Sequence, residues 1–134
     1  MKKKLLTLSV CILAQLSFTA YGDTPKASAE CEKHEQGTEK HSRCLDGVKD
    51  ALDRELQTWV NNHTLNLEDK SLVTGRYSAL KMFKRSQSNF ITFRDNNCRW
   101  QFLAISPERG ADTAYKKCYI RMTQNRITDL SVAQ

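Results

Sequence analysis

Apolar residues recur along the chain at intervals of three and four, the spacing that buries one face of an α-helix. The clearest stripe follows the Gly37-Thr38 pair, where glycine can end one helix and threonine can cap the next. Its members are Leu45, Val48, Leu52, Leu56, Trp59 and Val60. We expect residues 61–63 (Asn-Asn-His) to end this helix and the polar residues 64–71 to form a loop.

Two further stripes predict a long third helix and a shorter last helix. The stripe of the third helix contains Val73, Tyr77, Leu80, Phe83, Gln87, Phe90, Arg94 and Cys98. Gly75, near the start of this helix, is expected to kink it. After a turn at residues 106–110, Asp112 or Thr113 can cap the last helix. The stripe of the last helix contains Tyr115, Tyr119, Met122, Arg126 and Leu130.

A short leading helix is expected from about Pro25 to Glu35, because Thr24-Pro25 is typical of a cap followed by proline at the first helical position. No segment alternates at period two for long enough to demand a strand. Five glycines and two prolines are also too few for a turn-rich sandwich. The sequence therefore predicts an all-α fold, a small helical bundle of three main helices plus a short N-terminal helix.

The first 22 residues have the organisation of an export signal. Lysines at positions 2–4 precede the mostly apolar residues 5–16, and Ala20 and Gly22 provide the small residues of a cleavage site. Cleavage would leave one domain, residues 23–134, with no membrane anchor in a periplasmic or secreted protein. The formal charge of +6 then falls to +3, because the signal carries three lysines and no acids. A mildly basic chain with no basic stripe interleaved with aromatics is not expected to bind nucleic acid.

Four cysteines follow the expected signal, which itself contains Cys11. An even number of cysteines in an exported chain predicts two disulfides. We prefer the pairs Cys31–Cys44 and Cys98–Cys118 over the two other pairings, because each pair flanks a turn at which two helices can fold back on each other. Each bridge is expected to stabilise the fold by about 3 kcal/mol.

A zinc site is the alternative for the first pair, since Cys31, His34, His41 and Cys44 could form a tetrahedral set. Export through an oxidising compartment favours the disulfide, so we expect neither a metal nor another cofactor. No nucleophile lies beside a base in a recognisable motif, and no carboxylate pair has a set spacing. The sequence therefore predicts a protein without catalytic residues, not an enzyme.

Polar side chains on the apolar face of the third helix predict a structural network. Gln87 and Arg94 lie two turns apart on that face, and a buried arginine or glutamine must be paired. We interpret the set as a network that fixes helix register, in preference to a ligand site. Its expected members are Asp53, Gln87, Arg94, Asp95, Thr123 and Arg126.

These motifs, in this order, resemble the LprI-like family, secreted bacterial domains described as lysozyme inhibitors. The resemblance rests on two cysteines around a Gly-Thr turn, Asp53-x-x-Leu56-Gln57, Gln87-x-x-Phe90-x-x-Phe93-Arg94-Asp95-x-x-Cys98 and Cys118-x-x-x-Met122-Thr123-x-x-Arg126-x-x-x-Leu130. The family pattern has tryptophan at Phe90, tyrosine at Phe93 and asparagine at Gln57. These exchanges leave packing intact, although Phe93 lacks the tyrosine hydroxyl.

The resemblance implies a secreted or periplasmic binding protein whose partner is a lysozyme or another exported protein. The alternative is a non-enzymatic envelope accessory, stress or toxin-immunity protein with an unknown partner. If the target is a lysozyme, the candidate inhibitory loop contains Ser106, Glu108 and Arg109. A cationic side chain on a protruding loop can lodge between the two carboxylates of a glycosidase cleft. The competing interpretation is that Arg109 is an ordinary solvated arginine.

Overall fold

The computed structural model describes residues 23–133, which form four α-helices and contain no strand. The helices are α1 (Asp23–Cys31), α2 (Glu39–Thr74), α3 (Ser78–Ile105) and α4 (Ala111–Val132). This architecture confirms the predicted all-α class of three main helices and a short leading one. The expected export signal lies outside the described residues. Among the helices that are described, none is both long enough and apolar enough to span a membrane.

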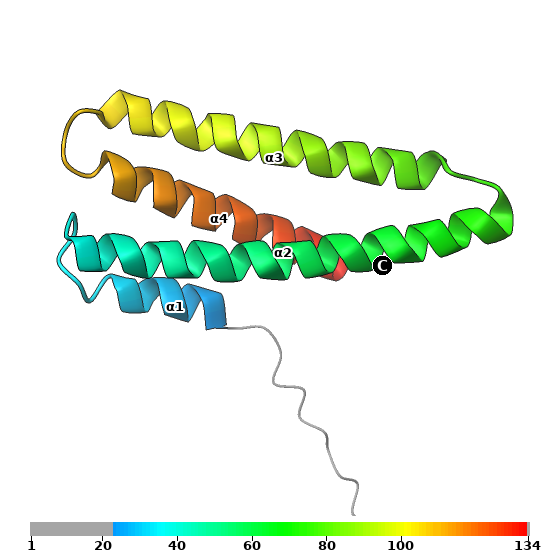
Figure 1. Ribbon diagram of the computed structural model, residues 1–134, viewed down its shortest axis with the longest axis horizontal. Coiled ribbons are helices and arrows are strands. Elements are labelled where there is room, and N and C mark those ends of the chain that lie inside the picture. Colours follow the sequence, from blue (N-terminus) through cyan, green and yellow to red (C-terminus); the bar gives the residue numbers. More distant parts are fainter. Residues whose placement is uncertain (1–22, 134) are drawn as a thin grey trace, which may run out of the picture.

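α4 packs against both α2 and α3, and α1 packs against α2 (Figure 1). The main core cluster consists of Cys31, Leu45, Val48, Leu52, Leu56, Ile120, Ile127 and Leu130. Because α4 touches two helices, its buried residues are not confined to one stripe, and they include Lys116 and Thr123. All five residues expected at helical spacing lie on α4; Leu130 is buried, whereas Tyr115, Tyr119 and Met122 are half-buried.

α2 is much longer than the sequence pattern predicted. It continues without a break through the expected end at residues 61–63 and through the expected loop at residues 64–71. Two contacts hold this extension in place. The Nε2 atom of His63 lies 2.7 Å from the Leu130 carbonyl oxygen, and the Lys84 ammonium lies 2.9 Å from Glu68. The segment is therefore a solvated helix held by α3 and α4.

Gly75 ends α2 instead of kinking the next helix. Its φ of 69° is left-handed, and its N–H donates to the Ser71 carbonyl, which closes the last turn of α2. Val73 consequently belongs to α2 and is 88% exposed, and Tyr77 is 43% exposed. The prediction that Val73 and Tyr77 lie on the buried stripe of the third helix is wrong.

The remaining helix ends agree only partly with the sequence. Thr38 caps α2 as expected, accepting a hydrogen bond from the His41 N–H at 3.3 Å. α1 ends at Cys31, four residues before the expected end, and a turn follows. Gly110 precedes α4 without a side-chain cap, so Asp112 and Thr113 lie inside the helix and neither caps it.

The two ends of the bundle differ in construction (Figure 1). The α1–α2 and α3–α4 connections lie together at one end, which we call the disulfide-held end. One disulfide joins Cys31 to Cys44 and the other joins Cys98 to Cys118, each with a Cα–Cα distance of 5.5 Å. At the opposite end α2 and α3 extend beyond the last turn of α4 and are joined by the short connection around Gly75.

Candidate functional site

The disulfide-held end presents two turns with an open pocket of about 730 Å³ between them. The α1–α2 turn contributes residues 35–38 to its wall, and the α3–α4 turn contributes Arg109 and Gly110. Thr113, Ala114 and Lys117 of α4 complete the lining. Each turn is closed at its base by a disulfide that ties the flanking segments together.

Glu32 connects the first turn to α4. Its carboxylate lies 2.9 Å from the Lys117 ammonium and 3.4 Å from His41 Nε2, and it accepts a hydrogen bond from Gln36 at 3.1 Å. The hydrogen bond from Lys117 is the main reason that the pKa of Glu32 is below its ordinary value, with burial opposing it. The carboxylate is therefore charged at neutral pH and fixes the turn against α4.

His41 is fully buried beneath this turn. Its Nε2 atom faces Glu32, and among the described residues its Nδ1 atom has no hydrogen-bond partner. Its burial under the turn and its contact with Glu32 suit a structural role.

Lys116 fixes the start of α4 to the start of α2. Its ammonium is almost completely buried and lies 2.6 Å from the Ser42 hydroxyl, 2.7 Å from Asp46 and 3.1 Å from Asp112. Burial lowers the pKa of Lys116, but the hydrogen bonds to Asp46 and Asp112 more than offset this effect, so the pKa is raised. The lysine therefore stays charged and ties the two helices together.

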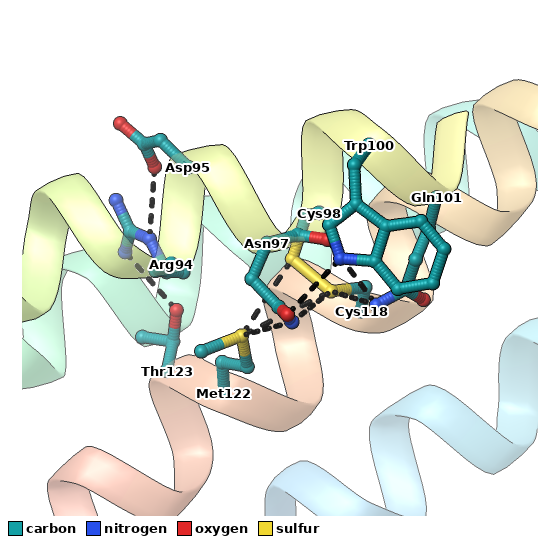
Figure 2. Close-up of a disulfide and its surroundings, with 9 residues drawn as sticks. All are labelled: Arg94, Asp95, Asn97, Cys98, Trp100, Gln101, Cys118, Met122 and Thr123. Atoms are coloured by element: carbon teal, nitrogen blue, oxygen red, sulfur yellow. Dashed lines mark hydrogen bonds and ion pairs between the residues drawn. A yellow bond between two sulfur atoms is a disulfide. The ribbon is translucent and has the colours of Figure 1, made fainter. Parts of the chain in front are cut away.

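The second disulfide is surrounded by sulfur and amide contacts from α3 and α4 (Figure 2). Met122 Sδ lies 3.8 Å from Cys98 Sγ and 3.9 Å from Cys118 Sγ. The side-chain amide of Asn97 donates to Met122 Sδ at 3.2 Å, and its oxygen accepts from the Trp100 indole at 3.2 Å. The bridge is thus packed on one side by Met122 and covered on another by polar side chains.

Arg94 lies one turn before this disulfide, and its guanidinium contacts side chains from three helices. Figure 2 shows the contacts with Asp95 and Thr123. It donates to the Thr123 hydroxyl at 3.1 Å, to Asp95 at 3.2 Å and to Asp53 at 3.4 Å. Its guanidinium carbon also lies 3.7 Å from the centroid of the Tyr119 ring. The charge of a buried arginine is thereby matched by two half-exposed carboxylates and an aromatic face.

Tyr119 completes the Arg94 network. Its hydroxyl lies 2.9 Å from both carboxylate oxygens of Asp53. Burial first, and then the hydrogen bond to Asp53, raise the pKa of Tyr119 far above its ordinary value. The phenol is therefore neutral and acts as a hydrogen-bond donor. The sequence did not single out this role for Tyr119, because nothing in the spacing of the chain connects it to Asp53.

Gln87 and Arg126 form a separate pair away from Arg94. The Arg126 guanidinium donates to the Gln87 amide oxygen at 3.2 Å and to the Ser86 hydroxyl at 3.3 Å. The Phe90 ring lies near both arginines, with centroid distances of 5.7 Å to Arg94 and 5.6 Å to Arg126. The six expected polar residues therefore form two neighbouring groups instead of one network.

The expected inhibitory loop lies at the edge of the pocket. Glu108 donates its N–H to the Ile105 carbonyl at 2.9 Å, and Gly110 has a φ of 101°, which favours glycine there. Ser106, Glu108 and Arg109 are exposed. Within residues 23–133, no hydrogen bond or ion pair engages the Arg109 guanidinium. Its charge is therefore available to a partner.

The zinc alternative for the first cysteine pair is not supported. Cys31 and Cys44 are joined in a disulfide, so neither is a thiolate that could ligate a metal. His34 and His41 lie near this bridge in sequence, and His41 faces Glu32. Across the part of the chain that the structure describes, no group of three or more His, Cys, Asp or Glu side chains is arranged to hold a metal ion.

Comparison with known proteins identifies a family. A family model described as lysozyme inhibitor LprI matches residues 31–130. The matched range begins at the first cysteine of the bundle and ends in the last turns of α4, so it includes both disulfides, the Arg94 network and the Arg109 turn. No curated protein and no solved structure is significantly similar to the chain.

Proposed function

Because the chain belongs to the LprI family, we propose that it is an exported, non-enzymatic binding protein that inhibits a lysozyme. The structural observation that supports this proposal is the disulfide-held end, where two bridged turns stand side by side. A rigid pair of turns loses little conformational entropy when it binds a partner. Two disulfides also suit a protein that works outside the reducing cytosol.

Arg109 is the proposed contact with the enzyme. Glycosidase clefts hold a pair of carboxylates, and a guanidinium can satisfy two carboxylates through charge-assisted hydrogen bonds. Arg109 is exposed at the tip of the α3–α4 turn, while Cys98–Cys118 holds the helices that flank it. Entry of this side chain between the catalytic carboxylates would block substrate binding without any chemical step.

The distribution of charge is compatible with a basic target. Residues 23–134 carry 18 basic and 15 acidic side chains, but five of the basic ones lie in residues 70–85, at the opposite end of the bundle. Without this segment, 13 basic and 15 acidic side chains remain. The two ends are separated by α2, whose 36 residues span about 50 Å. Salt screens charges beyond about 10 Å, so the basic end would not repel an enzyme bound at the disulfide-held end.

The test is an inhibition assay in which a basic animal lysozyme and a phage-type lysozyme digest cell walls. Arg109→Ala should weaken the inhibition of the sensitive enzyme by about thirtyfold or more, as loss of a central arginine does in other interfaces. The matched control is Arg54→Ala, because Arg54 is an exposed arginine on the middle of α2. Circular dichroism should show equal helicity for both variants.

Two outcomes would overturn the proposal at different levels. Equal inhibition by wild type and Arg109→Ala would exclude the Arg109 turn and leave inhibition through another surface. Failure of the wild-type protein to inhibit any lysozyme would remove the inhibitor function itself. An envelope accessory or toxin-immunity role would then be the remaining class.

A further inference from the structure

The end of the bundle that the inhibitor proposal does not use exposes several large apolar side chains. We call residues 70–85 the distal tip; it contains the last turn of α2, the connection and the first two turns of α3 (Figure 1). Leu72 is 73% exposed, Val73 88% and Met82 64%, and Tyr77 lies between them at 43%. Since α4 ends at Val132, short of this tip, no helix of the described chain covers these side chains.

The distal tip is also basic. It contains Lys70, Arg76, Lys81, Lys84 and Arg85 and no acidic residue. Lys84 is paired with Glu68 at 2.9 Å, whereas the other four cations form no ion pair with any described residue. A patch that combines protruding aliphatic side chains, a tyrosine and unpaired cations has the composition of a surface that binds anionic lipid.

We propose that the distal tip docks on the surface of an anionic phospholipid bilayer, with Leu72 and Val73 at the headgroup boundary and the unpaired cations against lipid phosphates. The binding is peripheral. A second copy of this chain is a poor occupant of the same surface, because a symmetric contact would bring two sets of cations together. An acidic protein would also satisfy the cations, but a bilayer offers an apolar phase directly beneath its anionic headgroups, which suits the adjacent Leu72 and Val73.

Vesicle co-sedimentation tests the proposal with protein recovered after export of the full chain, its N-terminus determined by mass spectrometry. Wild type should bind phosphatidylcholine vesicles that contain phosphatidylglycerol and should not bind pure phosphatidylcholine. Leu72→Ser/Val73→Ser should lower the affinity at least about tenfold. Arg76→Gln/Lys81→Gln should lower it by a similar factor, and added salt should weaken the wild type further.

Matched controls separate the tip from general surface effects. Phe93→Ser/Leu103→Ser removes two apolar side chains that are 62% and 56% exposed on α3 outside the tip, and it should bind vesicles as wild type does. The charge control is Lys40→Gln/Arg54→Gln, which removes two exposed cations from α2. All variants have the same N-terminus. Differences in vesicle affinity between them are therefore caused by the substitutions alone.

Three results would overturn the proposal. The first is equal binding of wild type to neutral and anionic vesicles, or binding to neither. The second is an equal loss of binding in the tip variant and its matched control. The third is wild-type binding to soluble polyglutamate as tight as to anionic vesicles, with no effect of Leu72→Ser/Val73→Ser; that result would identify an acidic macromolecule as the partner.

Discussion

At the scale of single residues, buried charge in this protein is matched across helices. The Arg94 guanidinium touches Thr123 on α4, Asp53 on α2 and Asp95 on its own helix, while the Tyr119 ring covers its face. These contacts connect all three long helices through one side chain. We infer that Arg94 fixes the register of the bundle, and that Tyr119 keeps Asp53 oriented toward it.

Arg94→Ala should therefore lower the free energy of unfolding by about 2–3 kcal/mol. Loss of a fully buried partner costs about 3–5 kcal/mol, but Asp53 and Asp95 are half-exposed and would be partly solvated when left alone. Chemical denaturation followed by circular dichroism measures the change. Arg85→Ala is the control on the same helix, because Arg85 is exposed, and it should change the stability by less than about 0.5 kcal/mol. Unchanged stability of Arg94→Ala, combined with loss of lysozyme inhibition, would instead place Arg94 in the binding site.

The sequence could identify the residues of this region but not all of their partners. Arg94 was recognisable because it falls on the apolar face of a helix, where a charge must be paired. Whether Arg126 pairs with Arg94's partners or with Gln87 depends on the rotation of α4 against α3, and no local pattern determines that angle. Glu32 and Lys117 are 85 positions apart in the sequence. Their contact also depends on how the helices pack, so no local pattern predicts it.

At the scale of elements, helix periodicity predicted how many helices form, and tertiary contacts decided where they end. Residues 61–71 looked like a helix end and a loop because they are polar. In the structure they are partly exposed turns of α2. His63 holds them by its contact with the Leu130 carbonyl and by a tilted contact with the Phe83 ring, at a centroid distance of 5.5 Å. A polar segment beside distant partners cannot be told from a loop by local propensity alone.

Lys116 is expected to give the contact between α2 and α4 a measurable pH dependence. Lys116→Met should lower the free energy of unfolding by about 1–2 kcal/mol at neutral pH, because Asp46 and Asp112 lose their shared partner. The pKa of Lys116 is raised in the folded state above its ordinary 10.5. Its contribution is then complete below pH 10.5, and it declines as the pH rises from there toward the higher folded-state pKa.

The measurement is the stability difference between wild type and Lys116→Met from about pH 8 to pH 12. This difference should be constant up to about pH 10 and should shrink above it. Lys40→Met is the control, since Lys40 is exposed on the first turn of α2, and its difference from wild type should stay near zero throughout. If the stability difference instead grew with pH, burial of the charged Lys116 would destabilise the folded state.

At the scale of the whole molecule, the bundle separates two surfaces of different chemistry. The disulfide-held end is cross-linked by two disulfides, carries both signs of charge and presents Arg109. The distal tip is basic and apolar, and within residues 23–133 it is formed by the hairpin of α2 and α3 alone. Because α4 stops before the tip, neither surface shares a residue with the other.

If both proposals hold, the two ends should act at the same time. α2 separates them by about 50 Å, several times the distance over which physiological salt screens charge, so binding at one end should not alter affinity at the other. Protein bound to anionic vesicles should therefore inhibit soluble lysozyme as well as free protein does. Arg109→Ala should keep vesicle binding while losing inhibition, and Leu72→Ser/Val73→Ser should show the reverse. Competition between vesicles and lysozyme for wild type would mean that the two ligands share one surface, and the assignment of separate ends would then be wrong. If wild type binds only vesicles or only lysozyme, the variant at the end assigned to that ligand still tests the corresponding proposal. Each proposal can therefore fail without the other.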